Sequence, residues 1–383
     1  MSDDRYEVDT LLIGSSPFMI FEAIRLKMGG QKVLVVDKSN VIGGAWYTKE
    51  LHTFKGVEIG CHFISNNAET YRFIETLLEK TGGKPLVKME PQPFILYKGF
   101  HFRRDSYIPH IRRGMYFSFK RKTWFDFWAF IKTFSIRMYR EFIDRFKNYP
   151  FKYPNGGCQD MMDCLNVLVE KFDIPILFET TVESVIINAS KSSGTSELSK
   201  GSVSFKHIAV SSCSNLSNLV IGDEFILIDK EQHRQHHLVM HLRGKRLKDF
   251  TYFDMTDQSY VIRGSDVGKY CQEFKNKRKE NEYLICVQIH ESKWQEGVDI
   301  SSVATPVLDH LKHKGFFAAD GELLNAWHDD YEFKVIKNAE LERLEKIAAP
   351  VLQTTLTLNL EVRLGNFASN SWTLALGDCV DEV

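Results

Sequence analysis

Two short apolar runs near the start of the chain are separated by a segment with a different spacing of apolar residues. VDTLLIG (8–14) is an apolar run that ends in glycine, and KVLVVDK (32–38) has four successive apolar residues followed by an acid. Such runs are typical of strands buried on both faces of a parallel sheet. Between them, residues 17–28 place apolar side chains at mostly helical spacing, and Gly29 and Gly30 follow as a helix end. The pattern predicts a strand, a helix and a second strand joined by a right-handed crossover.

The pattern changes several times further along the chain. Residues 151–190 again predict α/β structure, with a helix over residues 159–171. Residues 191–202 are polar and have no apolar period, so we predict an exposed loop. The other predicted elements are strands within residues 203–290 and helices over residues 302–314 and 338–348.

These interruptions predict an α/β fold with two discontinuous parts. Residues 1–70, 151–200 and 345–383 are expected to form a Rossmann-like, dinucleotide-binding domain around a parallel sheet. Residues 71–150 and 201–344 are expected to form an α+β substrate domain. A chain of 383 residues has a suitable length for two domains.

Composition narrows the function only slightly. The chain has 43% hydrophobic residues, 26% charged residues and a net charge of −1, and this composition does not indicate a nucleic-acid partner. The seven Cys include no C-x-x-C pair, which argues against a disulfide framework or a zinc site. The polar N-terminus and the absence of an apolar run of ~18 residues lead us to expect a cytoplasmic protein. The oligomeric state is left open.

Two further clusters each have a plain and a functional interpretation. His233, His236, His237 and His241 crowd one strand, but no Cys or acid completes a ligand set, so we expect a solvated strand edge and no metal. Residues 103–147 are rich in Lys, Arg and aromatics. That composition is found in helices that lie on a membrane surface and also in helices that line an apolar substrate pocket, and we favour the pocket.

The turn after the first predicted strand keeps part of a dinucleotide-binding motif. The pattern G-x-G-x-x-G has Gly14 in its first position, but Ser16 and Met19 replace the other two glycines. The helix that follows still directs its free N–H groups toward the turn, where they favour phosphate. Asp37, at the end of the second strand, is placed to accept a hydrogen bond from a ribose hydroxyl. An α/β turn without a ligand is the alternative.

Three more segments follow in an informative order. VVDKSNVIGGAWYT (35–48) has an acid, five residues and two glycines, GVEIGCHFISNN (56–67) has a strand and a turn, and KYPNGG opens residues 152–187. Together these segments resemble the FAD superfamily of amine oxidases, protoporphyrinogen oxidases, phytoene desaturases, UDP-galactopyranose mutases and Rab GDP-dissociation inhibitors. One departure is Ala45, which stands where the family has an Arg that clamps pyrophosphate.

The resemblance implies that FAD is the cofactor and that the Rossmann-like domain holds it. The implied contacts are Gly14, Ser15, Ser16, Pro17, Phe18, Asp37, Lys38, Gly43, Gly44, Ala45, Trp46, Gly60, Cys61, His62, Phe63, Val182, Arg363, Ser371 and Trp372. The last three depend on matching VRLGNFASNSWTLALGDCV to the family's final motif and helix. A competing alignment places Gly377 and Asp378 at the flavin instead.

The resemblance leads to three functional hypotheses. The leading one is an FAD-dependent oxidoreductase of the amine oxidase/desaturase type, which passes hydride from a C–N or C–C bond of a small-molecule substrate to flavin. The second is a flavin isomerase like UDP-galactopyranose mutase, acting on a nucleotide sugar. The third is a binding protein that keeps the fold without the cofactor. His62, Arg263 and Arg363 are the candidate catalytic residues, and none can be assigned as an acid or a base.

Overall fold

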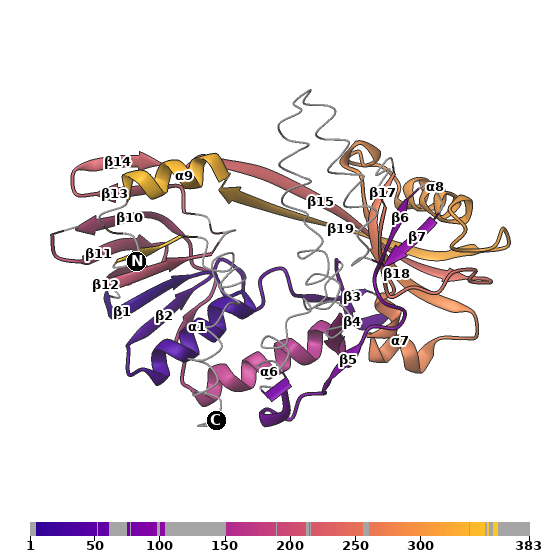
Figure 1. The fold of residues 1–383 in the computed structure, drawn as a ribbon, viewed down its shortest axis with the longest axis horizontal. Coiled ribbons are helices and arrows are strands. Elements are labelled where there is room, and N and C mark those ends of the chain that lie inside the picture. Colours follow the sequence, from indigo (N-terminus) through magenta and orange to yellow (C-terminus); the bar gives the residue numbers. More distant parts are fainter. Residues whose placement is uncertain are drawn as a thin grey trace, which may run out of the picture.

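The strands that the structure describes form two large sheets, which two long strands connect (Figure 1), and two small ones. The small sheets pair β3 (Thr48–Leu51) with β4 (Phe54–Glu58) and β5 (Leu86–Lys88) with β8 (Lys152–Pro154). The computed structural model describes residues 5–51, 53–60, 75–76, 78–97, 100–103, 151–188, 190–211, 214, 216–255, 260–336, 338–348, 351 and 355–358.

The first sheet has nine strands and is built around the predicted strand–helix–strand unit. β1 (Arg5–Ile13) pairs in parallel with β2 (Val33–Val36), and α1 (Pro17–Met28) connects them, as predicted. On its other side β1 pairs in parallel with β12 (Gly201–Val210). The order across the sheet is β14 (Glu224–Leu227), β13 (Asn218–Ile221), β10 (Val182–Asn188), β11 (Ser193–Leu198), β12, β1, β2 and β9 (Ile176–Leu177), with β20 (Leu356–Thr357) paired to β12.

The predicted loop over residues 191–202 is wrong, because this segment contains β11 and the start of β12. β11 lies antiparallel between β10 and β12, so the sheet is mixed where the sequence predicted a parallel one. Two of its three buried positions carry Gly194 and Ser196 and only the third carries an apolar residue, Leu198, which is why no apolar period is visible. A Cβ on Gly194 would lie 2.5 Å from the Phe205 ring, and the Ser196 hydroxyl donates to the Ser184 carbonyl at 2.7 Å.

Sheet membership also differs from the predicted division of the chain. β12, β13 and β14 fall within residues 201–344, which the sequence assigned to the substrate domain, yet they pair in the first sheet. The strands that follow β14 belong to the second sheet. The division into two domains therefore stays a prediction, and the first sheet continues past residue 200 to β14.

The second sheet has seven strands and a separate core. Its order is β19 (Glu322–Ile336), β15 (Lys230–Arg243), β18 (Glu282–Ile289), β17 (Val261–Ser265), β16 (Tyr252–Met255), β6 (Phe94–Tyr97) and β7 (Phe100–Arg103). The predicted helix over residues 302–314 is confirmed as α8 (Ile300–His313), whose buried face packs on this sheet.

β15 and β19 form a long antiparallel ribbon that reaches from the first sheet to the second (Figure 1). β15 lies between β19 and β18, and His236 and His237 are buried, so the predicted solvated edge is wrong. Nδ1 of His236 lies 3.1 Å from Nε2 of His328, which stacks on Trp294. In the part of the chain that the structure describes, no group of three or more His, Cys, Asp or Glu side chains is arranged for a metal.

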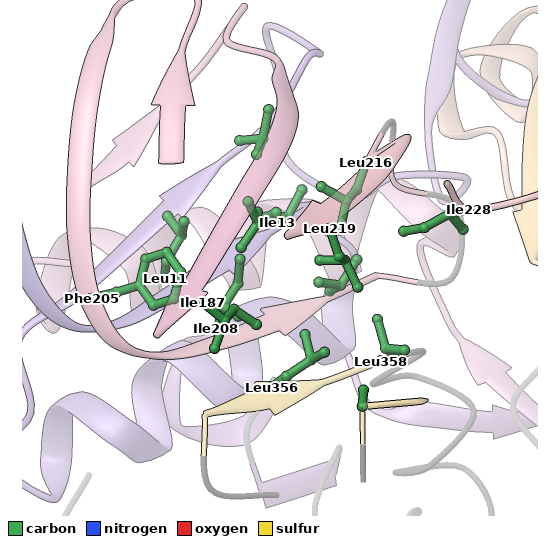
Figure 2. Packing of buried hydrophobic residues seen from close by; sticks show 14 of the residues in the cluster. Leu11, Ile13, Ile187, Phe205, Ile208, Leu216, Leu219, Ile228, Leu356 and Leu358 are labelled. Carbon is green, nitrogen blue, oxygen red and sulfur yellow. The ribbon is translucent and has the colours of Figure 1, made fainter. Parts of the chain in front are cut away.

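Helices cover both faces of the first sheet. α1 and α6 (Gly157–Lys171) pack with one face, and α9 (Asn338–Ile347) packs with the other. The helices predicted over residues 159–171 and 338–348 are therefore confirmed. Figure 2 shows the α9-side core, where Leu11, Ile208 and Leu219 from three strands point together. No helix among the described residues is long and apolar enough to cross a membrane.

Candidate functional site

A cavity of about 260 Å³ opens where β1, β2 and β12 end. The predicted cofactor residues that line it are Gly14, Ser15, Ser16, Pro17, Phe18, Asp37, Lys38, Gly43, Gly44, Ala45, Trp46 and Val182. They come from three segments that are far apart in the sequence. The carboxyl ends of neighbouring parallel strands form the crevice in which α/β folds bind nucleotides, so this is the expected position for a dinucleotide.

Gly14 makes the first turn tight. Its φ is +110°, in the region that favours glycine, and its N–H donates to the Val36 carbonyl at 2.8 Å. A Cβ on Gly14 would lie 2.7 Å from Cβ of Ser211, the residue after β12. Glycine is therefore required both by the backbone conformation and by the close approach of a neighbouring strand.

The carboxylate of Asp37 is tied to the same turn. Its Oδ2 accepts hydrogen bonds from the backbone N–H of Ser15 at 2.7 Å and from the Ser15 hydroxyl at 2.6 Å. Its Oδ1 accepts from the backbone N–H of Ser39 at 2.7 Å. A carboxylate oxygen can accept more than one hydrogen bond, so Asp37 is held in a fixed orientation and keeps acceptor capacity for a ligand hydroxyl.

Ser16 ends the turn and Pro17 begins α1, which suits the fixed φ of proline and its missing donor. The first turn of α1 contains no acidic residue, so its positive dipole end is not neutralised from within the helix. Ser16 faces the second glycine turn, where a Cβ on Gly44 would lie 3.4 Å from Cβ of Ser16. The serine therefore takes up space on the side of the cavity that faces Gly44.

The second glycine turn is bound to the first. The N–H of Gly43 donates to the Ser15 carbonyl at 2.8 Å. Gly43 has a φ of +115°, and a Cβ there would lie 2.3 Å from Sδ of Met162 on α6. Gly44 has a φ of +58°. The two turns and α6 thus form one packed unit around the cavity.

Met19, which replaces the third glycine of the motif, is completely buried in the core that α1 and α6 share with the sheet. Its neighbours in this core include Leu12, Met161 and Met162. The methionine side chain is therefore part of the packing of this α/β unit, and its replacement by glycine would open a cavity.

A buried polar cluster of Tyr153, Cys158 and Glu58 lies next to Trp46, one of the residues that line the cavity. The Trp46 ring stacks on Tyr153, with ring centroids 6.2 Å apart, and the Tyr153 hydroxyl lies 2.8 Å from Sγ of Cys158. Oε1 of Glu58 accepts the Cys158 N–H at 2.5 Å, at the N-terminus of α6. Burial raises the pKa of Glu58 to about 7, although the N–H donor opposes the shift. The sequence analysis did not identify Glu58.

Other predicted residues lie elsewhere. Gly60 is buried after β4 (Phe54–Glu58), and its carbonyl accepts from the Ser265 hydroxyl at 3.2 Å. Arg263 lies on β17 and donates to Gln288 of β18, away from the cavity lining. The predicted residues outside the described part of the chain are Cys61, His62, Phe63, Arg363, Ser371 and Trp372, together with residues 104–147 of the basic aromatic segment.

The architecture matches the folds of several solved enzymes. No protein-family model matches the chain, and no curated protein matches its sequence. A reduced UDP-galactopyranose mutase superposes with a TM-score of 0.60 at 14% identity, covering 91% of this chain and 87% of that one. The chain has the fold of the FAD-dependent amine oxidase superfamily.

Two further solved structures agree with this fold. Wild-type putrescine oxidase bound to putrescine superposes with a TM-score of 0.56 at 12% identity, covering 96% of this chain and 99% of that one. An oxidoreductase from Methanosarcina mazei gives a TM-score of 0.52 at 13% identity, with 84% of this chain and 87% of that one covered. The predicted resemblance to the amine oxidase superfamily is therefore confirmed at the level of fold.

The cavity residues fit the adenosine and phosphate end of a superfamily cofactor. Gly14 leaves the turn open to a phosphate, and the unneutralised first turn of α1 favours an anion. Asp37 offers oriented carboxylate oxygens to a ribose. Lys38 adds a positive charge to the lining.

Sequence reasoning missed several polar residues of the lining, namely Thr180, Thr181, Ser211, Ser214 and Tyr331. Ser211 follows β12 as Gly14 follows β1, so placing β12 beside β1 would have identified it. Tyr331 comes from β19, and its ring lies 6.1 Å from Tyr47. The Tyr47 hydroxyl in turn donates to Asp329 at 2.5 Å. No local pattern indicates that β19 reaches this cavity.

Proposed function

We propose that the chain binds FAD in the cavity beside β1, β2 and β12 and acts as an oxidoreductase of the amine oxidase/desaturase type. The observation that carries this proposal is convergence. Residues 14–18, 37–38, 43–46 and Val182, selected from the sequence by their resemblance to flavin-contacting segments, line one cavity in a fold shared with flavoenzymes. The first two segments belong to one β-α-β unit, and β10 brings Val182 from a distant part of the chain to the same crevice.

The residues of the chain would divide the binding between them. Asp37, oriented by Ser15 and Ser39, would accept from the ribose, and the Val182 backbone would contact adenine. The Gly14 turn and the first turn of α1 would hold the phosphates. Bound flavin would supply the hydride acceptor, and the substrate would be a small molecule with an oxidisable C–N or C–C bond.

A mutase-like reaction on a nucleotide sugar is the second proposal. It is favoured by the likeness to UDP-galactopyranose mutase, which has a TM-score of 0.60 over 91% of this chain. In that case the flavin would act in its reduced state without net oxidation of the sugar. A cytoplasmic location remains part of the proposal for both reactions.

Absorbance measurements with FAD-loaded protein separate these functions. Anaerobic addition of a panel of amines should bleach the visible flavin absorbance if the chain is an amine oxidase. Conversion of UDP-galactopyranose only after dithionite reduction would instead favour the mutase. A protein that holds FAD but gives neither result, with a desaturase panel also silent, would contradict both enzymatic proposals.

A further inference from the structure

A second cavity, of about 480 Å³, lies in the second sheet region and shares no lining residue with the dinucleotide cavity. It lies between α7 (Gln272–Lys277), the 3-10 helix η1 (Val267–Lys269) and the start of β18. Its charged lining consists of Arg246, Asp249, Asp266, Lys269, Lys275 and Arg278. Four cations thus face two anions.

The two acids are already neutralised by two of the cations. Arg246 is buried, with its Nη1 2.6 Å from Oδ2 of Asp266 and its Nη2 3.2 Å from Oδ1 of Asp249. Arg246 also donates to the carbonyls of Lys248 at 3.0 Å and Phe250 at 2.5 Å. Nζ of Lys269 lies 3.2 Å from the same Asp249 oxygen. Arg246 is therefore a fixed structural element of the cavity wall.

Lys275 and Arg278 are left with two uncompensated charges. Neither side chain forms an ion pair or a hydrogen bond with any residue that the structure describes. Lys275 is half-buried, and its pKa is lowered first by burial and then by repulsion from Lys84 and Arg278, while Cys271 and Asp160 oppose the shift. Asp160 itself pairs with Lys84, with Nζ and Oδ1 3.4 Å apart. Like charges held at the edge of a cavity raise the local concentration of an anion.

We propose that this cavity is a binding site for a phosphate monoester. A phosphate monoester carries a charge of about −1.5 to −2 at neutral pH, which matches the two uncompensated cations. The planar Arg278 guanidinium can bind two phosphate oxygens at once, and Lys275 supplies a mobile point charge. A carboxylate carries one negative charge and would neutralise only one of these two cations. The site is independent of the proposed flavin site.

The test is calorimetric titration with inorganic phosphate and with glycerol 3-phosphate at constant ionic strength. The native protein should bind both saturably. K275Q/R278Q should bind at least ~tenfold more weakly, as the loss of charge-assisted hydrogen bonds predicts. The control K277Q/K279Q also removes two positive charges from this segment, but at positions outside the cavity lining. It should bind phosphate within about twofold of the native affinity.

Two results would overturn the proposal. One is the absence of saturable binding by the native protein up to ~10 mM, which is weaker than a built site provides. The other is equal affinity for the native protein and K275Q/R278Q, with matching urea-unfolding midpoints showing that both are folded. Sedimentation with phosphatidylcholine vesicles containing phosphatidic acid identifies the source of the monoester. Loss of sedimentation in K275Q/R278Q would assign the site to a lipid headgroup, and calorimetric binding without sedimentation would assign it to a soluble ligand.

Discussion

The two glycine turns beside the dinucleotide cavity respond differently to sequence change. The first turn has lost two of the motif's three glycines and keeps Gly14, whereas the second keeps both Gly43 and Gly44. At Gly14 and Gly43, a left-handed φ coincides with a neighbour closer than 3 Å to the position of a Cβ. At Ser16, the facing residue is a glycine that leaves room for a side chain.

This contrast separates two physical requirements that can make a position in these turns favour glycine. One is the fold itself, since a strained φ and a close neighbour exclude any other residue whether or not a ligand binds. The other is the approach of a pyrophosphate, which matters only in the bound state. The fold keeps the first kind in this chain, and Ser16 stands where the second kind is expected. The backbone conformation of the turn is thus preserved, and the Ser16 side chain occupies space that a glycine would leave open.

Alanine substitution at the two adjacent glycines gives the largest expected effect. Gly43→Ala should destabilise the protein by about 2–4 kcal/mol, because the strained φ is combined with a Cβ 2.3 Å from Sδ of Met162. Gly44→Ala should cost about 1 kcal/mol, since its φ is +58° and the nearest atom, on Ser16, is 3.4 Å away. Urea unfolding of both variants measures the difference.

Gly56→Ala is the matched control for these variants. Gly56 has a φ of +67°, and no atom lies within 4 Å of the position of a Cβ. Its substitution therefore measures the cost of a side chain at a left-handed φ without any steric contact. If Gly43→Ala cost no more than Gly56→Ala, close packing of the second turn against α6 would not be what keeps Gly43.

A third glycine turn extends the comparison to Glu58. A Cβ on Gly157 would lie 2.1 Å from Oε1 of Glu58, so this glycine makes room for a buried acid. The folded-state pKa of Glu58 is about 7, above its ordinary value of 4.5, so the folded protein binds the proton more tightly than the unfolded chain does. Stability from this group is fully present below pH 4.5 and is lost as the pH rises to about 7.

Glu58→Gln should remove this pH dependence. Between about pH 5 and about pH 8, the native protein should lose up to about 3 kcal/mol more unfolding free energy than the variant, an upper bound from the pKa difference. Urea unfolding of both proteins at the two pH values gives the comparison. Parallel pH profiles would show that Glu58 is not the group that titrates.

Ser15→Ala should have a smaller effect that is specific to the first turn. The variant loses the hydroxyl bond to Oδ2 of Asp37 and keeps the bond from the Ser15 N–H, so we expect a loss of about 1–2 kcal/mol. FAD affinity should fall by only a few fold, because Asp37 stays in place but is less firmly oriented. Thermal unfolding with and without FAD distinguishes the two effects. A change in affinity as large as that of Asp37→Ala would contradict a merely orienting role.

The sequence predicted the local units of the fold well, because α6, α8 and α9 carry clear periodicity within short windows, and α1 is bounded by a strand on each side and by two glycines at its end. It failed at β11, where Gly194 and Ser196 fill two of the three buried positions and are stabilised by contacts with other strands. Periodicity cannot reveal such contacts, because they join residues that are distant in sequence.

The candidate site shows the same division. The residues of the two glycine turns were predicted from motifs and converge as expected. Ser211 and Tyr331 were missed because they enter the cavity through long-range strand pairing, by β12 beside β1 and by the long β19. Glu58 was missed because its burial depends on the packing of α6 and Gly157 over β4.

The central claim is that the degenerate turn still binds FAD, and a fluorescence titration of the protein with FAD tests it most directly. The matched variants are Ser16→Gly, which gives the cofactor pyrophosphate more room beside the first turn, and Asp37→Ala, which removes the carboxylate that would accept from the ribose. Met19→Gly is unsuitable, because Met19 is fully buried and its loss would cost about 2–5 kcal/mol. We predict saturable binding by the native protein, tighter binding by Ser16→Gly, and at least ~tenfold weaker binding by Asp37→Ala. The absence of saturable binding by both the native protein and Ser16→Gly would contradict the claim, and the chain would then be better described as a binding protein that has kept this fold without its cofactor.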